Sequence, residues 1–124
     1  MKKWILALMV LVGSWSLAQG GCDNPADDFD RLYCVNQEFV QADKELNDRY
    51  KELFAKLNAE GQRLLREAQR NWIKARNKES QATLNGEVVF YMGTATRMTK
   101  ERVEFLKTRL RECNSTGCVN SKLR

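Results

Sequence analysis

The sequence predicts an all-α fold in which three main helices form antiparallel hairpins in a small bundle with disulfide-stapled ends. Three observations predict it: apolar residues recur at steps of three and four, the connections are short, and four cysteines cluster near the ends of the predicted bundle. The chain has 124 residues, of which 43% are hydrophobic and 30% charged. This length and balance indicate one small globular domain rather than a disordered segment.

Residues 1–18 have the pattern of a secretory signal peptide. Lys2 and Lys3 precede the apolar run 4–12, and small residues stand three and one positions before Gln19. The run is too short to span a bilayer, so no stable membrane insertion is expected. Cleavage before Gln19 leaves residues 19–124 as one exported domain, periplasmic or secreted. A lipoprotein signal ending at Cys22 is the alternative, although it lacks the Leu that usually stands three positions earlier.

Residues 29–57 predict the first helix. Asp27 is its expected N-cap, and Asp30 adds a carboxylate to the first turn, where the helix dipole favours negative charge. Lys44 and Lys51 lie off the apolar stripe, as they should in an amphipathic helix. The stripe consists of Phe29, Leu32, Tyr33, Asn36, Phe39, Val40, Asp43, Leu46, Asn47, Tyr50, Leu53, Phe54 and Leu57.

Two further helices are predicted over residues 59–81 and 88–112. A short connection at 58–61 favours antiparallel neighbours, and Asn85-Gly86 marks the second turn. No strand is predicted, because no period-two alternation of useful length occurs. The start of the third helix, around Gly93, is weak in helix propensity. The remaining tail, 113–124, is polar.

The four cysteines predict two disulfides, since an even number in a small exported domain is typical of disulfide-bonded proteins. Sequence alone allows three pairings, and the clustering favours Cys22–Cys34 and Cys113–Cys118. A straight helix running from just after Cys22 to Cys34 would separate the two beyond the reach of a disulfide. Either the preceding chain folds back alongside the first turn, or the helix kinks after Cys34, or Cys22 has another partner.

Composition and charge exclude several classes of function. The sequence contains no His and no C-x-x-C, so no metal site and no cofactor are expected. Residues 19–60 hold ten acidic and five basic residues, whereas residues 61–124 hold six acidic and fourteen basic residues. The two halves are expected to pack on one another. Because the basic residues alternate with Glu in an exported chain, a nucleic-acid partner is not expected.

Polar residues on the inner faces carry the most specific information. Folding 29–57 and 59–81 as an antiparallel hairpin places Asp43 opposite Arg76, where the two can form a charge-assisted pair. The same register places Asn47 opposite Trp72, Tyr50 opposite Gln69, and Phe54 opposite Leu65. Repeating the argument across the Asn85-Gly86 turn places Arg102 near Trp72 or Gln69. One interpretation is a buried network in which every polar group is paired. The other is a shallow polar pocket that grips a partner's side chain or a glycan.

These residues also carry a family resemblance. The segments A-D-K-E-L-N from Ala42, with Tyr50, and A-Q-R-N-W-I from Ala68, with Arg76, resemble the LprI-type lysozyme inhibitor family, as do Thr99 and Arg102. The resemblance covers roughly residues 22–112 and implies a small, exported, helical protein. It also implies a disulfide between the second and third helices, whose two cysteines are replaced here by Ser80 and Thr94.

The resemblance implies a binding module rather than an enzyme, acting by non-catalytic occlusion of a lysozyme-like muramidase. The acidic outer face of the first helix is the expected contact with a cationic rim, and its candidate residues are Glu38, Glu45, Asp48 and Glu52. The alternative is a structural or interaction protein of the cell envelope, either a homodimer, a component of an envelope complex, or a peptidoglycan binder. An assembly role predicts exposed apolar area on the third helix. A glycosidase would require a second carboxylate near Asp43, and the stripe that carries Asp43 has none there.

Overall fold

The computed structural model describes residues 22–124, and the predicted signal peptide lies outside these described residues. The described chain folds into the long helix α1 (Asp28–Lys56), the antiparallel helix α2 (Ala59–Glu79), a β-hairpin, and the helix α3 (Met92–Ser115). The hairpin strands are β1 (Gln81–Leu84) and β2 (Glu87–Phe90), and a short 3-10 helix, η1 (Asn120–Lys122), follows α3. The predicted all-α bundle is therefore confirmed, with a minor two-stranded sheet added.

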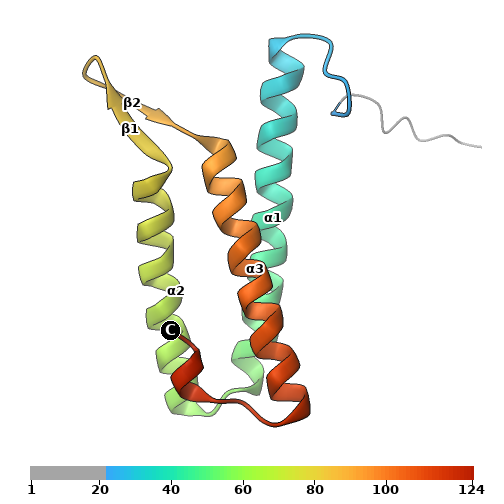
Figure 1. Ribbon diagram of the computed structural model, residues 1–124, viewed down its shortest axis with the longest axis vertical. Coiled ribbons are helices and arrows are strands. Elements are labelled where there is room, and N and C mark those ends of the chain that lie inside the picture. The colour runs from blue at the N-terminus through green and yellow to red at the C-terminus, as the bar shows by residue number, and fades with distance from the viewer. Residues whose placement is uncertain (1–21) are drawn as a thin grey trace, which may run out of the picture.

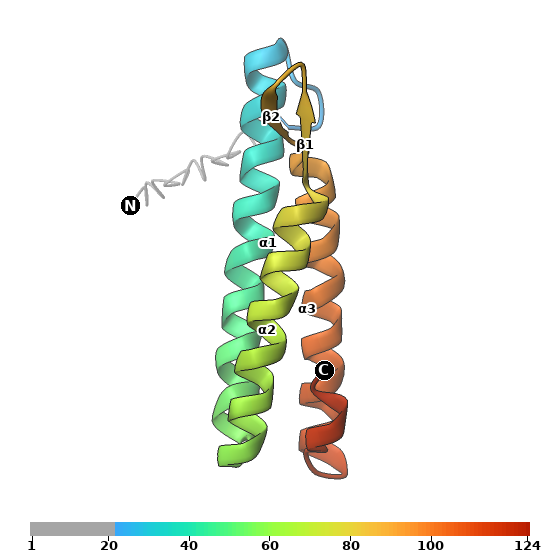
Figure 2. The ribbon, with the colours of Figure 1, turned by 90° about the vertical axis from the view of Figure 1, so that its left-hand side faces the viewer.

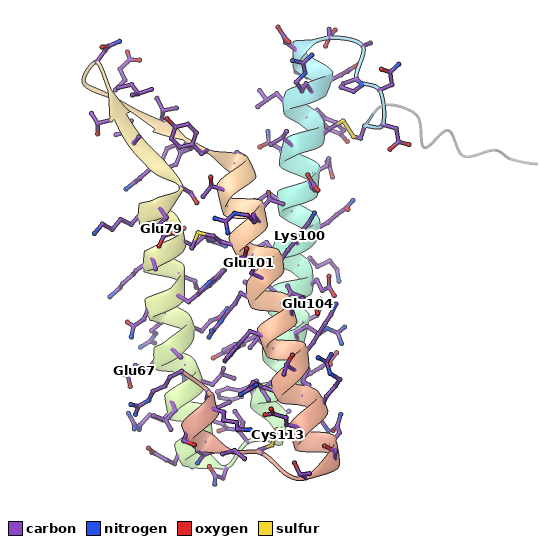
Figure 3. The ribbon with its side chains drawn as sticks, viewed as in Figure 1. Glu67, Glu79, Lys100, Glu101, Glu104 and Cys113 are labelled. Carbon is purple, nitrogen blue, oxygen red and sulfur yellow. A yellow bond between two sulfur atoms is a disulfide. The ribbon has the colours of Figure 1, made fainter. Side chains whose placement is uncertain are left out.

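The start of α1 agrees with the sequence analysis. Asp27 is the N-cap, and its side chain accepts a hydrogen bond of 2.8 Å from the backbone N–H of Asp30. The chain before this cap folds back, so that Cys22 pairs with Cys34 at a Cα separation of 5.3 Å. This disulfide is drawn in yellow beside α1 in Figure 3. The lipid of a lipoprotein is attached through the same Cys sulfur, so this disulfide and lipidation of Cys22 exclude one another.

The prediction of helix over residues 80, 81 and 88–91 is wrong, because these residues belong to the hairpin and its flanks. The turn residues Asn85 and Gly86 both have positive φ, 52° and 85°, as the preferred two-residue hairpin turn requires. The strands around the turn are rich in β-branched residues such as Thr83 and Val88, which favour extended backbone. Each strand has four residues, too few for an alternating pattern to stand out.

The end of the chain is held by two features. Cys113 pairs with Cys118, which confirms the second predicted disulfide. Beyond it, η1 returns the chain to the start of α2, where the Asn120 side-chain amide donates to the Asn58 side-chain oxygen at 3.1 Å. Leu123 is only 1% exposed and belongs to the main core. The tail is thus a structural part of the bundle, which its polar composition did not indicate.

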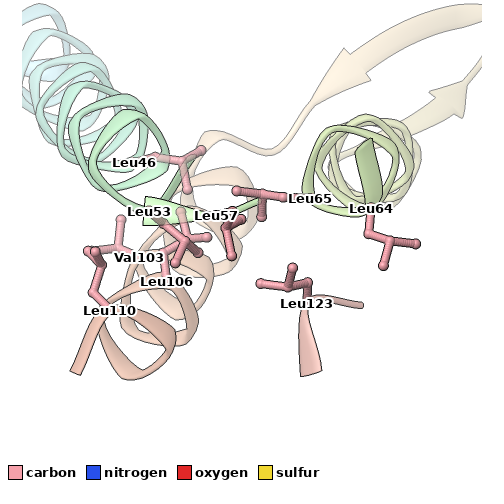
Figure 4. Close-up of a cluster of buried hydrophobic side chains, with 9 residues drawn as sticks. All are labelled: Leu46, Leu53, Leu57, Leu64, Leu65, Val103, Leu106, Leu110 and Leu123. Carbon is pink, nitrogen blue, oxygen red and sulfur yellow. The ribbon is translucent and has the colours of Figure 1, made fainter. Parts of the chain in front are cut away.

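The three helices do not pack equally closely. α1 and α3 run in the same direction and lie against each other along most of their length, whereas α2 runs antiparallel to both and contacts α1 much less (Figures 1 and 2). The core lies mainly in the half of the molecule that contains the α1–α2 connection. Figure 4 shows its apolar side chains, which are Leu46, Leu53, Leu57, Leu64, Leu65, Val103, Leu106, Leu110 and Leu123.

Among residues 22–124, none of the helices is both long enough and apolar enough to cross a membrane.

Candidate binding groove

The predicted ion pair between Asp43 and Arg76, which sets the register of α1 against α2, is present. An Arg76 guanidinium nitrogen lies 3.3 Å from an Asp43 carboxylate oxygen. The same nitrogen donates to the Thr99 hydroxyl of α3 at 3.4 Å, so Arg76 joins all three helices. The Arg76 guanidinium also lies over the rings of Phe39 and Trp72, at 5.3 and 5.1 Å from their centroids. The antiparallel placement predicted from the sequence is therefore correct at this position.

The next two predicted hydrogen bonds along the register are not formed. In the described part of the chain, no hydrogen bond joins Asn47 to the Trp72 indole or Tyr50 to Gln69. Asn47 instead donates to Asp43 within its own helix, at 3.4 Å, and Gln69 accepts from Arg102. The physical reason is that α1 packs on α3 rather than closely on α2, which leaves the facing side chains of α1 and α2 apart.

These side chains line a groove of about 450 Å³ between α1 and α2. We call it the motif groove, because most of its lining belongs to the sequence motifs that suggested the family. Its lining residues are Asp43, Leu46, Asn47, Tyr50, Arg66, Gln69, Arg70, Ile73 and Arg76. The prediction of a shallow polar pocket thus describes this seam better than the prediction of a fully paired network.

The motif groove is positively charged. Arg66, Arg70 and Arg76 contribute three guanidinium groups, whereas Asp43 is its only lining carboxylate. In the described residues, Arg66 and Arg70 form no ion pair, although Arg66 stacks on Phe54 at 5.3 Å. Guanidinium groups bind carboxylates in a two-pronged geometry, so the groove can hold an anionic group of a ligand. A lone carboxylate does not provide the acid and base pair that glycoside hydrolysis needs.

Arg102 occupies the neighbouring seam between α2 and α3, as the sequence predicted. Its Nε donates to the Gln69 side-chain oxygen at 3.0 Å, and its guanidinium lies 4.3 Å from the Phe105 ring centroid and 5.9 Å from that of Trp72. The residue is 9% exposed, and its Nη2 atom has no hydrogen-bond partner in the described chain. Burial without a carboxylate partner lowers the pKa of Arg102 to about 10.

The four carboxylates predicted to contact a partner lie on the other side of α1, and each is part of an ion pair. Two of them bridge α1 to α3: Glu38 pairs with Lys100, which is labelled in Figure 3, at 2.6 Å, and Glu45 pairs with Lys107 at 2.9 Å. The hydrogen bonds that Lys107 donates to Glu45 and Glu104 raise the pKa of Lys107.

The remaining two pair within α1. Asp48 binds Lys44 at 2.7 Å, which lowers the pKa of Asp48, and Glu52 binds Arg49 at 2.9 Å. Across all four residues, 43–58% of the side-chain surface is still exposed. The face is therefore accessible, but its negative charge is locally balanced by basic residues. Pattern reasoning along α1 alone could not reveal the balancing lysines of α3.

Ser80 and Thr94, the two positions where the resemblance implied cysteines, lie at the base of the hairpin. Ser80 is buried at the end of α2, and Thr94 lies in the first turn of α3. The backbone N–H of Tyr91, just before α3, donates to the Ser80 carbonyl at 2.8 Å, so the two helix ends are joined here. The Ser80 hydroxyl has no hydrogen-bond partner in the described residues.

The comparison with known families agrees with these motifs. The profile of the family described as "Lysozyme inhibitor LprI" matches residues 22–106, which is most of the described chain. The chain belongs to the LprI lysozyme inhibitor family. No curated protein and no solved structure matches the chain.

Family membership bears on the compartment and on the chemistry of the chain. Together with the two disulfides, membership indicates an extracytoplasmic protein. It indicates a lysozyme as partner at the level of the family. Within residues 22–124, no three potential metal ligands of the types His, Cys, Asp or Glu cluster together.

Proposed function

We propose that this chain is an exported, non-catalytic inhibitor that binds a lysozyme-like muramidase and occludes its cleft. The observation that carries the proposal is the family match over residues 22–106, which covers all of α1 and α2 and more than half of α3. Export to the periplasm or the medium would bring the protein to the place where muramidases act on the cell wall.

The acidic face of α1 supplies the contact in this proposal. The side chains of Glu38, Glu45, Asp48 and Glu52 are each about half exposed and would meet the cationic rim of a muramidase. Exposed ion pairs contribute at most about 1 kcal/mol to stability, so exchanging a lysine of this chain for a cation of the partner costs little. Charge complementarity of this kind accelerates encounter more than it raises affinity.

The test is a titration of residues 19–124, oxidised, into a lysozyme assay on cell-wall substrate at low salt. Lysozyme activity should fall with added protein, and the quadruple variant E38Q/E45Q/D48N/E52Q should inhibit less and with a weaker dependence on salt. A matched variant that removes four carboxylates elsewhere, E67Q/E79Q/E87Q/E101Q, should inhibit like the parent. Undiminished lysozyme activity at a large molar excess of the parent protein would refute the proposal.

The motif groove favours a second candidate, binding of peptidoglycan in the cell envelope. Arg66, Arg70 and Arg76 would hold carboxylates of the wall's peptides, with Tyr50 and Gln69 as hydrogen-bonding groups. Cosedimentation with purified peptidoglycan tests this candidate. The variant R66Q/R70Q should reduce binding, whereas K74Q/K78Q, on the same helix but outside the groove lining, should not. Equal binding by both variants would exclude the groove.

A further inference from the structure

One half of the apolar stripe of α1 is left uncovered. An amphipathic stripe such as that over residues 29–57 predicts a buried face, and from Leu46 onward the stripe enters the core. In the first part of the helix it is exposed instead: Phe29 is 73% exposed, and Leu32, Tyr33 and Val40 are each more than half exposed. By helical periodicity, this part of the stripe lies on the same side of α1 as Asn47, further along the helix. That side of α1 faces α2.

The β-hairpin is the second uncovered apolar element, and it stands at the same end of the molecule. Leu84, Val88, Phe90 and Tyr91 are 45–64% exposed. Figure 1 shows the hairpin and the first turns of α1 standing apart at this end, with β2 as the strand nearer to α1. We call the hairpin, the adjoining Tyr91 and residues 28–40 of α1 together the open end.

The rest of the described chain does not cover the open end. The segment before α1 is bound through Cys22 to Cys34, five residues after Phe29 and therefore about 140° around the helix from it. That segment lies on the side of α1 that carries Arg31 and Glu38, away from Phe29. Eight of the ten exposed large hydrophobic side chains among residues 22–124 belong to the open end, and none of the ten lies on α3, where an assembly role was predicted to place them.

The hairpin also presents a free strand edge. In an antiparallel pair, hydrogen-bonded and non-hydrogen-bonded residue pairs alternate. The bond from the Tyr91 N–H to the Ser80 carbonyl places Ala82–Val89 and Leu84–Glu87 in the hydrogen-bonded set. The N–H and C=O groups of Val88 and Phe90 therefore point away from β1, toward an unpaired edge. An isolated two-stranded hairpin is marginally stable in water, so this edge favours a further strand.

A second copy of this chain matches the open end in area, chemistry and symmetry. The eight exposed side chains sum to roughly 800 Å², given ~150–250 Å² for a fully buried aromatic residue, and a standard interface buries about 800 Å² per partner. If β2 pairs antiparallel with β2 of the second copy about a two-fold axis at Val89, the outward-pointing Val88 lies opposite Phe90, and Glu87 lies opposite Tyr91. No like charges then face each other.

We propose that the open end is a homodimer interface. In this dimer β2 of each copy pairs with β2 of the other, and the apolar side chains of each hairpin pack on the exposed stripe of the other copy's α1. The arrangement is isologous, because the same two elements are used on both sides. It covers the uncovered stripe and joins the two hairpins into a four-stranded sheet. This inference does not depend on the proposed inhibitory function.

The test is sedimentation of oxidised residues 19–124 over a wide range of concentration, with the helix content followed by circular dichroism. The parent protein should sediment as a dimer that dissociates on dilution. The variant V88K/F90K should be monomeric with unchanged helix content, since both side chains are exposed. The variant I73K/V119K, which changes two exposed apolar residues outside the open end, should remain a dimer.

A single hairpin variant could act by weakening the hairpin rather than the interface. The variant F29K/Y33K, on the other element of the open end, addresses this and should also be monomeric. A parent protein that stays monomeric at high micromolar concentration would overturn the proposal. This holds even if the monomer uses the same face to bind lysozyme. Persistence of the dimer in both V88K/F90K and F29K/Y33K would also overturn it.

Discussion

The two ends of this molecule differ in how they use the same kind of sequence. At the end that contains the α1–α2 connection, the apolar stripe of α1 meets α2, α3 and the tail, and Leu53 and Leu106 are fully buried. At the open end the stripe continues with the same periodicity, yet Phe29 and Leu32 lie in solvent and the hairpin leans away. The difference shows that an amphipathic pattern predicts a buried face without saying which molecule buries it.

The largest expected difference between the ends is in the cost of shortening a side chain. Leu106→Ala should lower the free energy of unfolding by about 2–5 kcal/mol, because it leaves a cavity in the core. Leu32→Ala should change it by less than about 0.5 kcal/mol in dilute protein, because the side chain is exposed. Urea unfolding of both variants measures the contrast. Similar losses for the two would mean that the open end is packed in solution.

At the junction between the two ends, an added disulfide should stabilise the fold. The variant S80C/T94C should form a third disulfide and raise the free energy of unfolding by about 2 kcal/mol, because it ties the helix ends that flank the hairpin. Thiol titration and urea unfolding measure the two effects, with the variant's reduced form as the control. Two thiols that remain free under oxidising conditions would show that residues 80 and 94 are not neighbours.

In the seam between α2 and α3, Arg102→Lys should destabilise the protein by about 1–3 kcal/mol. The planar guanidinium of Arg102 contacts the Phe105 and Trp72 rings while it donates to Gln69, and the ammonium group of Lys cannot do both. Arg97→Lys, at an exposed pair with Glu101, should have almost no effect. Thermal unfolding compares the two variants. An equal response would show that the buried guanidinium is not specifically held.

The smallest effect expected is that of pH. The chain has no His, so its stability should be nearly constant between about pH 5 and 8. Hydrogen bonds from Lys44 and Arg63 hold the pKa values of Asp48 and Glu60 below those in the unfolded chain. Stability from these pairs is therefore present at neutral pH and lost as the pH falls through the acidic range. Urea midpoints from pH 3 to 8 measure this; a steep change near neutrality would contradict it.

Much of the fold could be predicted from the sequence because helix periodicity is local. The course of α1, its cap at Asp27, both disulfides and the contact between Asp43 and Arg76 were all predicted correctly. The hairpin was missed because its four-residue strands are too short to show alternation. Leu123 was missed because a single apolar residue in a polar tail has no period, although it fills the core.

The candidate site could be predicted only in part, because it depends on how far apart the helices lie. The sequence placed Asn47 and Tyr50 on the correct face of α1, but not the separation that leaves them lining a groove. Arg66 was missed as a lining residue, although its four-residue spacing from Arg70 on α2 gave the signal that it shares that face. The lysines that pair with Glu38 and Glu45 come from α3, a relation between distant segments that α1 alone does not contain.

Amide hydrogen exchange on oxidised residues 19–124, at low and at high protein concentration, tests the division into two ends most directly. In dilute protein the amides around Leu53 and Leu106 should exchange slowest, and those of Val88 and Phe90 much faster, because their N–H groups lie on an unpaired edge. Raising the concentration should slow exchange at Val88 and Phe90 while leaving the core amides unchanged. Equally slow exchange at both ends in dilute protein would contradict the division into a packed end and an open end. Exchange at the hairpin amides that does not change with protein concentration would also contradict it.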